Sequence, residues 1–243
     1  ESPYIESLWN VMRQVWDKKL LYKAHRVVPF CTRCGTALSS HEVAQGYKVV
    51  KDTSVYLKFK VENGKFKDAY ILAWTTTPWT LPGNVALAVG KEIDYVVGKQ
   101  GKEKFIIAKE IASKILGDKF QIEQEIKGGD LVGSKYKPLF DVPALRSEKS
   151  YQVYEADFVA TNEGTGVVHT AVMYGEDDYT LGTKLGLPKV HTVDAQGKFT
   201  GVSEELDGLY VKDPKTEKLI LEHLEKNGNL LKIESHEHEY PFC

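Results

Sequence analysis

The chain has 243 residues, of which 42% are hydrophobic and 27% are charged, and its net charge is −2. This composition is ordinary for a globular protein and excludes a collagen, a coiled coil and a disordered tail. The apolar runs are far shorter than the roughly 20 residues of a membrane-spanning helix, so we expect no membrane partner. The 32 basic residues are balanced by 34 acidic ones. A long groove that binds nucleic acid is therefore disfavoured, and a polyanion would have to bind a local basic patch.

The three cysteines are too few for the disulfide framework of a secreted domain. We therefore expect a reducing, cytoplasmic location. The sequence begins with Glu1 rather than Met, and we interpret it as a piece of a longer protein. We expect that protein to be a monomer.

Helical spacing and the pair Ser2-Pro3 predict a first helix that runs to about Leu21. Its apolar stripe, which begins at Ile5 and ends at Trp16, is expected to pack on a neighbour. Alternation and turn residues then predict strands over 55–61, 69–74, 84–89, 95–98, 104–108, 121–126, 151–160 and 166–171. Further helices are predicted over 109–116, 176–185 and 214–226.

This order contains many short strands and few helices, without the regular strand–helix alternation of a doubly wound sheet. The sequence therefore predicts a β-rich α+β fold. Its core is expected to be a closed or nearly closed β-barrel with peripheral helices.

Cys31 and Cys34 form a Cys-x-x-Cys turn followed by Gly35, which is half of a zinc knuckle. Cys243 is a third candidate ligand, so the predicted metal site is incomplete within this sequence. His236 and His238 are alternative ligands, although a His-x-His pair in an acidic tail is more often simply exposed. A redox role is disfavoured because no thioredoxin-like pattern surrounds the turn.

A second cluster begins at Trp74 and reads Trp-Thr-Thr-Thr-Pro-Trp-Thr-Leu-Pro-Gly-Asn, ending at Asn84. Consecutive threonines on a strand point to alternate faces, so Thr75, Thr76 and Thr77 offer hydroxyls on both sides. The two prolines would fix the loop that follows. The plain alternative is a strand that enters a constrained loop.

A third cluster reads Gly-Thr-Gly-Val-Val-His-Thr-Ala, with His169 near its end, and Gly-Glu-Asp-Asp-Tyr follows with Asp178. The plain alternative for the acidic residues is helix capping by Glu176 and Asp177, which the helix dipole favours. The sequence contains no phosphate-binding glycine loop, zincin motif or nucleophile elbow.

Together, these clusters resemble the editing (CP1) domain of isoleucyl-tRNA synthetase, a class I aminoacyl-tRNA synthetase, over essentially the whole chain. Val172 departs from the family, which commonly has proline there. The family's ATP-dependent synthetic-site signatures are absent. On this reading residues 1–46 are a helical stalk with half of a zinc knuckle, 47–228 the β-barrel editing domain, and 229–243 a return strand toward the parent synthetase.

The resemblance implies proofreading hydrolysis of valine from Val-tRNA(Ile), and of valyl-adenylate, with the tRNA acceptor end and the rest of the synthetase as partners. Asp178 would bind the substrate ammonium and Thr76 the ester or terminal adenosine. His169 would form the wall that rejects isoleucine, with a general-base role as the rival. The remaining substrate contacts implied are Trp74, Thr75, Thr77 and Asn84.

Editing itself needs no cofactor on this reading, neither a catalytic metal nor a covalent nucleophile, and structural zinc is expected only in the full-length parent. Two alternatives remain open. The first is the corresponding domain of a valyl enzyme, which would clear Thr-tRNA(Val). The second is a non-enzymatic zinc module that docks tRNA.

Overall fold

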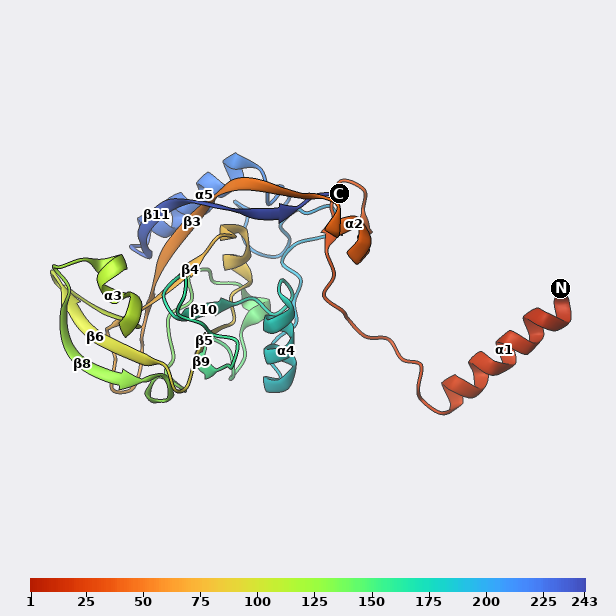
Figure 1. Cartoon of the computed structure of the whole chain (residues 1–243), viewed down its shortest axis with the longest axis horizontal. Helices are drawn as coiled ribbons and strands as arrows, with labels where there is room; N and C mark the ends of the chain where they lie inside the picture. Colours follow the sequence, from red (N-terminus) through yellow and green to blue (C-terminus); the bar gives the residue numbers. More distant parts are fainter.

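The computed structural model describes all 243 residues as a mixed α+β fold (Figure 1). The helices are α1 (Ser2–Asp17), α2 (Ser40–Ala44), α3 (Lys109–Leu116), α4 (Glu176–Leu185) and α5 (Pro214–Lys226). Three short 3₁₀ helices are η1 (Pro78–Gly83), η2 (Gly128–Asp130) and η3 (Pro143–Leu145). None of the helices combines the length and the hydrophobicity that a membrane crossing requires.

The strands form three separate sheets. A six-stranded sheet has the order β11-β3-β4-β7-β6-β8, and a three-stranded sheet has the order β10-β5-β9. The large sheet contains β3 (Tyr47–Lys60), β4 (Tyr70–Thr75), β6 (Asp94–Gln100), β7 (Glu103–Ala108), β8 (Gln121–Lys127) and β11 (Leu230–Pro241). The smaller one contains β5 (Ala86–Val89), β9 (Gln152–Glu155) and β10 (Val167–Thr170), and β1 (Phe30–Cys31) pairs with β2 (Thr36–Ala37).

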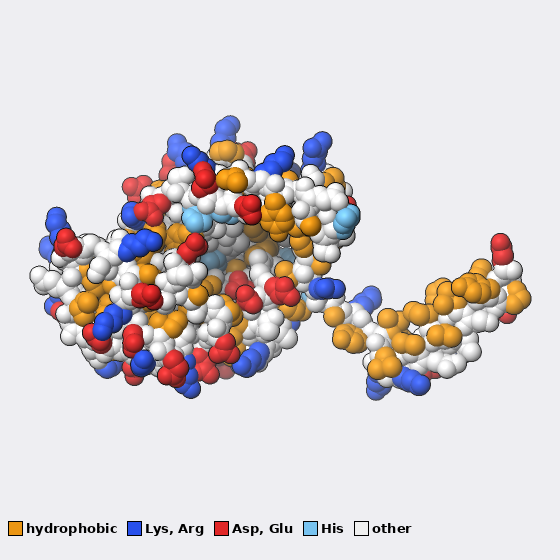
Figure 2. Space-filling model, viewed as in Figure 1, with side chains coloured by type: hydrophobic (Ala, Val, Ile, Leu, Met, Phe, Trp, Pro, Cys, Tyr) orange, Lys and Arg blue, Asp and Glu red, His pale blue; other side chains and the backbone are white.

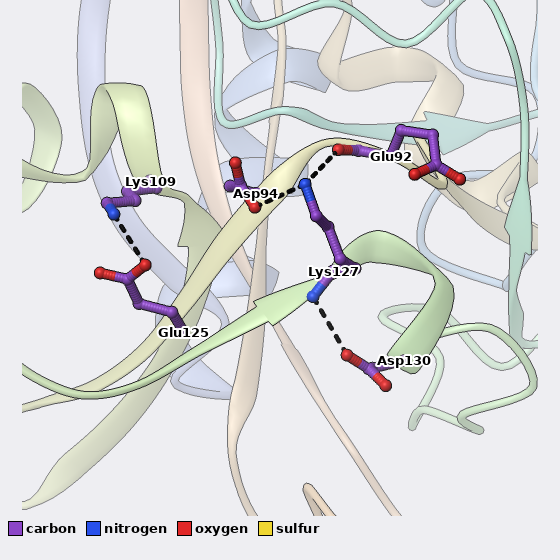
Figure 3. A network of polar contacts seen from close by, with 6 residues as sticks. All are labelled: Glu92, Asp94, Lys109, Glu125, Lys127 and Asp130. Atoms are coloured by element: carbon purple, nitrogen blue, oxygen red, sulfur yellow. Dashed lines mark hydrogen bonds and ion pairs between the residues drawn. The ribbon is translucent and has the colours of Figure 1, made fainter.

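The predicted barrel is wrong, because no sheet closes. The large sheet ends at β11 on one side and at β8 on the other, and these two strands do not pair. Most of β8 is exposed, and charged side chains protect this edge from further pairing. In Figure 3 the Lys127 ammonium lies 2.8 Å from Asp94 and donates to the Glu92 carbonyl, while Lys109 pairs with Glu125. Alternating strands are common to open and closed sheets, so the sequence pattern does not separate the two.

The other edge carries a two-stranded extension, because β3 is much longer than its neighbour β4. Strand β4 pairs only with Val55–Lys60 of β3, whereas β11 pairs with β3 as far as Tyr47. Residues 47–54 and 234–241 therefore form a ribbon that projects beyond the sheet, here called the β3–β11 arm. Its tip lies beside the Cys-x-x-Cys turn, next to the C-terminus in Figure 1.

The first helix is confirmed from Ser2, although it ends at Asp17 rather than near Leu21, and no other part of the structure covers its apolar stripe. Helix α1 has no buried residue and stands apart from the body of the molecule (Figure 1). Its apolar stripe is exposed, including 68% of Trp9 and 62% of Trp16, and it is visible along the helix in Figure 2. An exposed apolar surface of this kind is typical of an interaction site.

The other predicted helices are confirmed at their predicted bounds. Helix α3 ends at Gly117, which has a φ of 67°, and α5 is capped by Asp213, whose Oδ1 accepts the Lys215 N–H at 2.8 Å. The predicted strands are also present, although β3 begins at Tyr47 rather than at Val55. The region 151–160 contributes only the four residues of β9 before the chain turns away.

The glycine-rich turn before β10 fits closely against the large sheet. Gly166 has a φ of +72°, and a Cβ there would lie 2.4 Å from the Cβ of Ala108. Gly164 has a φ of +71°, and a Cβ there would lie 3.0 Å from the Trp74 ring. Only glycine satisfies both the backbone conformation and this approach. The turn therefore holds β10 next to the threonine-rich end of β4.

Val172 joins the end of β10 to helix α4. It is buried, and a Cβ on Gly182 of α4 would lie 2.5 Å from its Cγ2. The helix can approach this closely because residue 182 lacks a side chain. Val172 therefore packs directly against α4, the helix that carries Asp178 in its first turn.

We expect Gly182→Ala to lower the free energy of unfolding by about 1–3 kcal/mol, because the new methyl group overlaps Val172. Alanine is the better helix former by about 1 kcal/mol, so a net loss isolates the clash. Denaturant unfolding measures the effect. The double variant Val172→Ala/Gly182→Ala should recover part of the loss, and strictly additive single variants would contradict the contact.

Candidate functional site

The threonine-rich segment leaves β4 and folds back on itself through side-chain hydrogen bonds. Thr75 Oγ1 accepts the Thr77 N–H at 3.1 Å and lies 3.2 Å from Thr77 Oγ1. Thr80 Oγ1 donates to the Thr77 carbonyl at 2.8 Å. The two prolines at the ends of this segment give it the compact form of η1. Thr76 is half-exposed, and its hydroxyl is not part of this network.

His169 joins β10 to this segment. It is buried, and its Nε2 lies 2.8 Å from Thr80 Oγ1. Its Nδ1 lies 3.1 Å from Nδ2 of Asn84, a residue that lies just before β5 in the chain. The structure thus brings together Thr75, Thr77, Asn84 and His169, which the sequence placed in two clusters.

The position of the proton on His169 follows from Asn84. Asn84 Nδ2 donates to the Ala86 carbonyl at 2.9 Å, and Asn84 Oδ1 accepts the Tyr136 hydroxyl proton at 2.7 Å. The second Nδ2 proton therefore points at His169 Nδ1, which must be an acceptor. The His169 proton is on Nε2 and is donated to Thr80. Neither ring nitrogen is left to accept a proton from water.

Burial lowers the pKa of His169 to about 4, so the ring is neutral at pH 7. The sequence did not single out Tyr136, which lies 52 positions from Asn84 and carries no motif. Burial raises the pKa of Tyr136 well above its ordinary value, and its hydroxyl is therefore a permanent donor. Asn84 thus has the role of orienting His169, while its predicted contact with adenosine stays a prediction.

Asp178 lies in the first turn of α4 and reaches back to the end of β10. Its Oδ2 accepts the Ala171 N–H at 3.1 Å, two residues after His169. Burial raises the pKa of Asp178 to about 6, although the bond from Ala171 works in the opposite direction. Asp177 is exposed on the same turn and Asp178 is half-buried, so only Asp178 is directed toward the body of the molecule.

Figure 2 shows a hollow in this face of the molecule, between the course of the arm above and that of β10 and α4 below. The half-buried ring of Trp74 flanks the Gly-Thr-Gly turn on this side. Trp79 of η1 packs edge-on against Tyr174, with ring centroids 5.3 Å apart. A separate cavity of about 180 Å³, beside Phe66 and Val97, contains none of the candidate residues.

The three cysteines meet at the tip of the β3–β11 arm. All three sulfur atoms lie within 4.8 Å of one another, and those of Cys34 and Cys243 are 3.9 Å apart. Tetrahedral zinc with bonds of about 2.3 Å spaces its sulfur ligands about 3.8 Å apart, so the geometry fits three of four ligands. The Cys34 N–H lowers the pKa of Cys31, which favours the thiolate that binds metal.

Residues 1–225 match the family model of tRNA synthetases class I (I, L, M and V). The chain belongs to this class I tRNA synthetase family. It is 50% identical, over its full length, to an isoleucine–tRNA ligase of Clostridium novyi and 46% identical to one of Bacillus thuringiensis. The chain spans 23% of the length of these relatives.

Two solved structures share the fold of this family member. The CP1 domain of a leucyl-tRNA synthetase, GlLeuRS-CP1, has a TM-score of 0.59 at 16% identity and covers 74% of this chain and 99% of its own. The editing domain of the P. knowlesi cytosolic leucyl-tRNA synthetase has a TM-score of 0.55 at 14% identity, and the match covers 76% of this chain and 97% of that domain. The predicted resemblance to an isoleucyl CP1 domain is confirmed.

The buried, neutral state of His169 predicts how stability depends on pH. Between about pH 6.5 and pH 4 the unfolded chain binds a proton here that the folded chain does not, so the unfolding free energy decreases as the pH is lowered. Asp178 acts in the opposite direction, because folding raises its pKa. When the pH is lowered from 7 to 5, the unfolding free energy of His169→Asn should decrease by about 2 kcal/mol less than that of the wild type.

Chemical denaturation at the two pH values measures this difference. Asp178→Asn should lose more unfolding free energy than the wild type over this pH range, because it removes the opposing contribution of Asp178. A titration of the His169 ring by NMR provides a check that needs no variant. A midpoint near pH 6.5 would contradict the assignment.

Proposed function

We propose that this chain is the editing region of an isoleucine–tRNA ligase and hydrolyses valine from Val-tRNA(Ile), with valyl-adenylate as a second substrate. One observation carries the proposal. A single hydrogen-bonded assembly joins the threonine-rich segment to His169, and Asp178 binds the backbone two residues beyond that histidine. The identity of the relatives favours the isoleucyl function over the valyl one.

The need for such a site follows from the similarity of the two amino acids. One methylene is worth only about 1–3 kcal/mol in a hydrophobic pocket, and isoleucyl-tRNA synthetase is the standard example of this limit. A second pocket that admits valine and excludes isoleucine by size reverses the preference of the first.

Asp178 supplies the group that recognises an amino acid. Its Oδ2 is held by the Ala171 N–H, which leaves Oδ1 to accept the α-ammonium of the substrate. A half-buried carboxylate discriminates strongly for a cation, because partial desolvation strengthens their attraction. The N-terminus of α4 also favours the ionised form. Above pH 6 Asp178 is ionised and ready to bind.

The reaction is the hydrolysis of an ester. A water oxygen adds to the valyl carbonyl carbon, and the intermediate collapses as the bond to the ribose oxygen breaks, which releases valine and restores the ribose hydroxyl. Such an ester needs mainly a positioned water and a donor for the oxyanion. The half-exposed Thr76 hydroxyl is the available donor, whereas Thr75 and Thr77 are engaged with each other.

His169 is assigned to the wall of the pocket. A ring whose two nitrogens are both occupied, and whose pKa is about 4, is a poor general base at pH 7. Its hydrogen bonds to Thr80 and Asn84 also hold it rigid, and a size filter depends on such rigidity. The proposal also includes two partners, which are the tRNA acceptor end and the rest of the synthetase. It further includes a structural zinc held by Cys31, Cys34 and Cys243.

Deacylation of Val-tRNA(Ile), Ile-tRNA(Ile) and Thr-tRNA(Val) tests the function directly. We expect rapid loss of the valyl ester alone in the wild type, and attack on both valyl and isoleucyl esters by His169→Ala. The matched control is His191→Ala, which changes a histidine away from this network. Preference for the threonyl ester would assign the valyl function, and an unchanged preference in His169→Ala would exclude His169 as the wall.

Asp178→Asn should reduce kcat/KM for Val-tRNA(Ile) by at least about 100-fold, since it removes the only charge directed at the ammonium. Asp177→Asn is the matched control on the same turn and should stay near the wild-type value. In the wild type, kcat/KM should fall about tenfold per pH unit below pH 6, as Asp178 takes up its proton. Wild-type turnover by Asp178→Asn would remove Asp178 from the site.

A further inference from the structure

Aromatic side chains follow one another along one face of the β3–β11 arm. His236, His238 and Tyr240 are two residues apart on β11, and side chains at this spacing share a face of the strand. All three are half-buried. These three residues are here called the β11 platform.

The rings of the platform form a continuous series. The centroids of His236 and His238 are 5.4 Å apart, and those of His238 and Tyr240 are 6.0 Å apart. Phe242 extends the series beyond Tyr240 at 5.7 Å. At the other end, His236 lies edge-on to Trp74, with the centroids 5.2 Å apart. The series therefore runs from the candidate site toward the cysteine cluster.

The opposite face of the same strand has a different character. Glu237 and Glu239 alternate with the platform residues and are exposed. Glu237 lies 3.6 Å from Lys51 of β3 across the strands. A strand that faced only solvent would not need aromatic residues at every second position. The arm therefore has one polar face and one aromatic face.

Two cations accompany the aromatic face. The Lys212 ammonium lies 4.9 Å from the ring centroid of Tyr240 and 5.9 Å from that of Trp79. The Lys48 ammonium lies 5.3 Å from the centroid of Phe242. In addition, His238 Nε2 lies 3.0 Å from Asp52 Oδ2, which fixes the orientation of that ring.

The platform belongs to the strand that runs above the hollow of Figure 2. Histidine atoms lie at the upper rim of this hollow in Figure 2, where Figure 1 shows the course of β11. Trp74 contacts the platform through His236 and the Gly-Thr-Gly turn through Gly164. A chain molecule whose end occupies the candidate site would thus continue along the platform.

We propose that the β11 platform binds, by base stacking, the unpaired nucleotides that precede the terminal adenosine of an RNA acceptor end. The inference rests on the proposed function, which places that adenosine and its ester beside Thr76 and Asp178. Aromatic rings beside isolated cations are the common surface for single-stranded RNA, because every base offers a face for stacking.

The net charge of the chain is consistent with this mode of binding. A surface that neutralised many phosphates would need a basic excess, which a protein with a net charge of −2 lacks. Stacking on rings needs few ion pairs. Binding through the platform should therefore weaken only shallowly as salt increases, with a slope set by Lys212 and Lys48.

Fluorescence anisotropy with a labelled single-stranded RNA that ends in CCA measures this binding without any hydrolysis. Substitution of His238 or Tyr240 by alanine should raise the dissociation constant about 5- to 100-fold, the range for loss of one stacked base. His238→Phe should bind like the wild type, because it keeps the ring and loses only the contact with Asp52. Glu239→Ala, on the opposite face, is the matched control.

Equal binding by the wild type and the alanine variants, or no binding by the wild type, would overturn the platform. A steep salt dependence that is the same in all variants would also overturn it, since that result would indicate nonspecific attraction of phosphates.

A second measurement separates the platform from the proposed function. Valylated CCA and valyl-adenosine carry the same ester, but only the first has the preceding nucleotides. In Tyr240→Ala the ratio of their kcat/KM values should fall about 5- to 100-fold. If neither ester is hydrolysed by the wild type, the proposed function fails while the anisotropy result still decides the platform. An unchanged ratio would overturn the platform alone.

Discussion

The carboxamide of Asn84 connects the parts of the candidate site, and the arrangement of its neighbours depends on it. It donates to the Ala86 carbonyl and to His169, and it accepts the proton of Tyr136. Because the group is buried, each of these bonds prevents a costly unsatisfied polar atom. Only one orientation of the amide satisfies all partners. That orientation selects the tautomer of His169, which in turn positions Thr80 and the backbone of Thr77.

The same network explains how two titratable groups near one strand end have different environments. His169 lies inside the network and is held neutral by burial. Asp178 lies at the helix terminus, half-buried, with one backbone donor and with an exposed carboxylate beside it. A size filter requires a rigid neutral group, whereas recognition of an ammonium requires a charge. Burial of one group and partial burial of the other supply both properties within ten residues of the chain.

The open sheet is what allows the arm to exist. If β8 and β11 paired, the large sheet would close and β11 would be flanked on both sides. Instead β11 is an edge strand, and β3 outgrows β4 to carry it beyond the sheet. One pair of strands thus joins the threonine-rich segment to the three cysteines. A metal at the tip would fix the far end of the same ribbon whose aromatic face borders the site.

The sequence by itself determined the local elements and the family. Caps, glycine stops and turn residues act between near neighbours, so α3, α4, α5 and most strands could be predicted from their own segments. Each motif is also local, so the sequence showed Thr75–Thr77 in one cluster and His169 with Asp178 in another, and only the family resemblance joined the two in one predicted site. Three features were decided only by the tertiary structure. The open sheet could not be predicted, because the alternation of a strand does not show which edge strands pair. The exposure of α1 could not be predicted either, because helical periodicity shows an apolar face but not what covers it. Tyr136 reaches Asn84 from 52 residues away, a contact that depends on how distant segments pack and that no local pattern records.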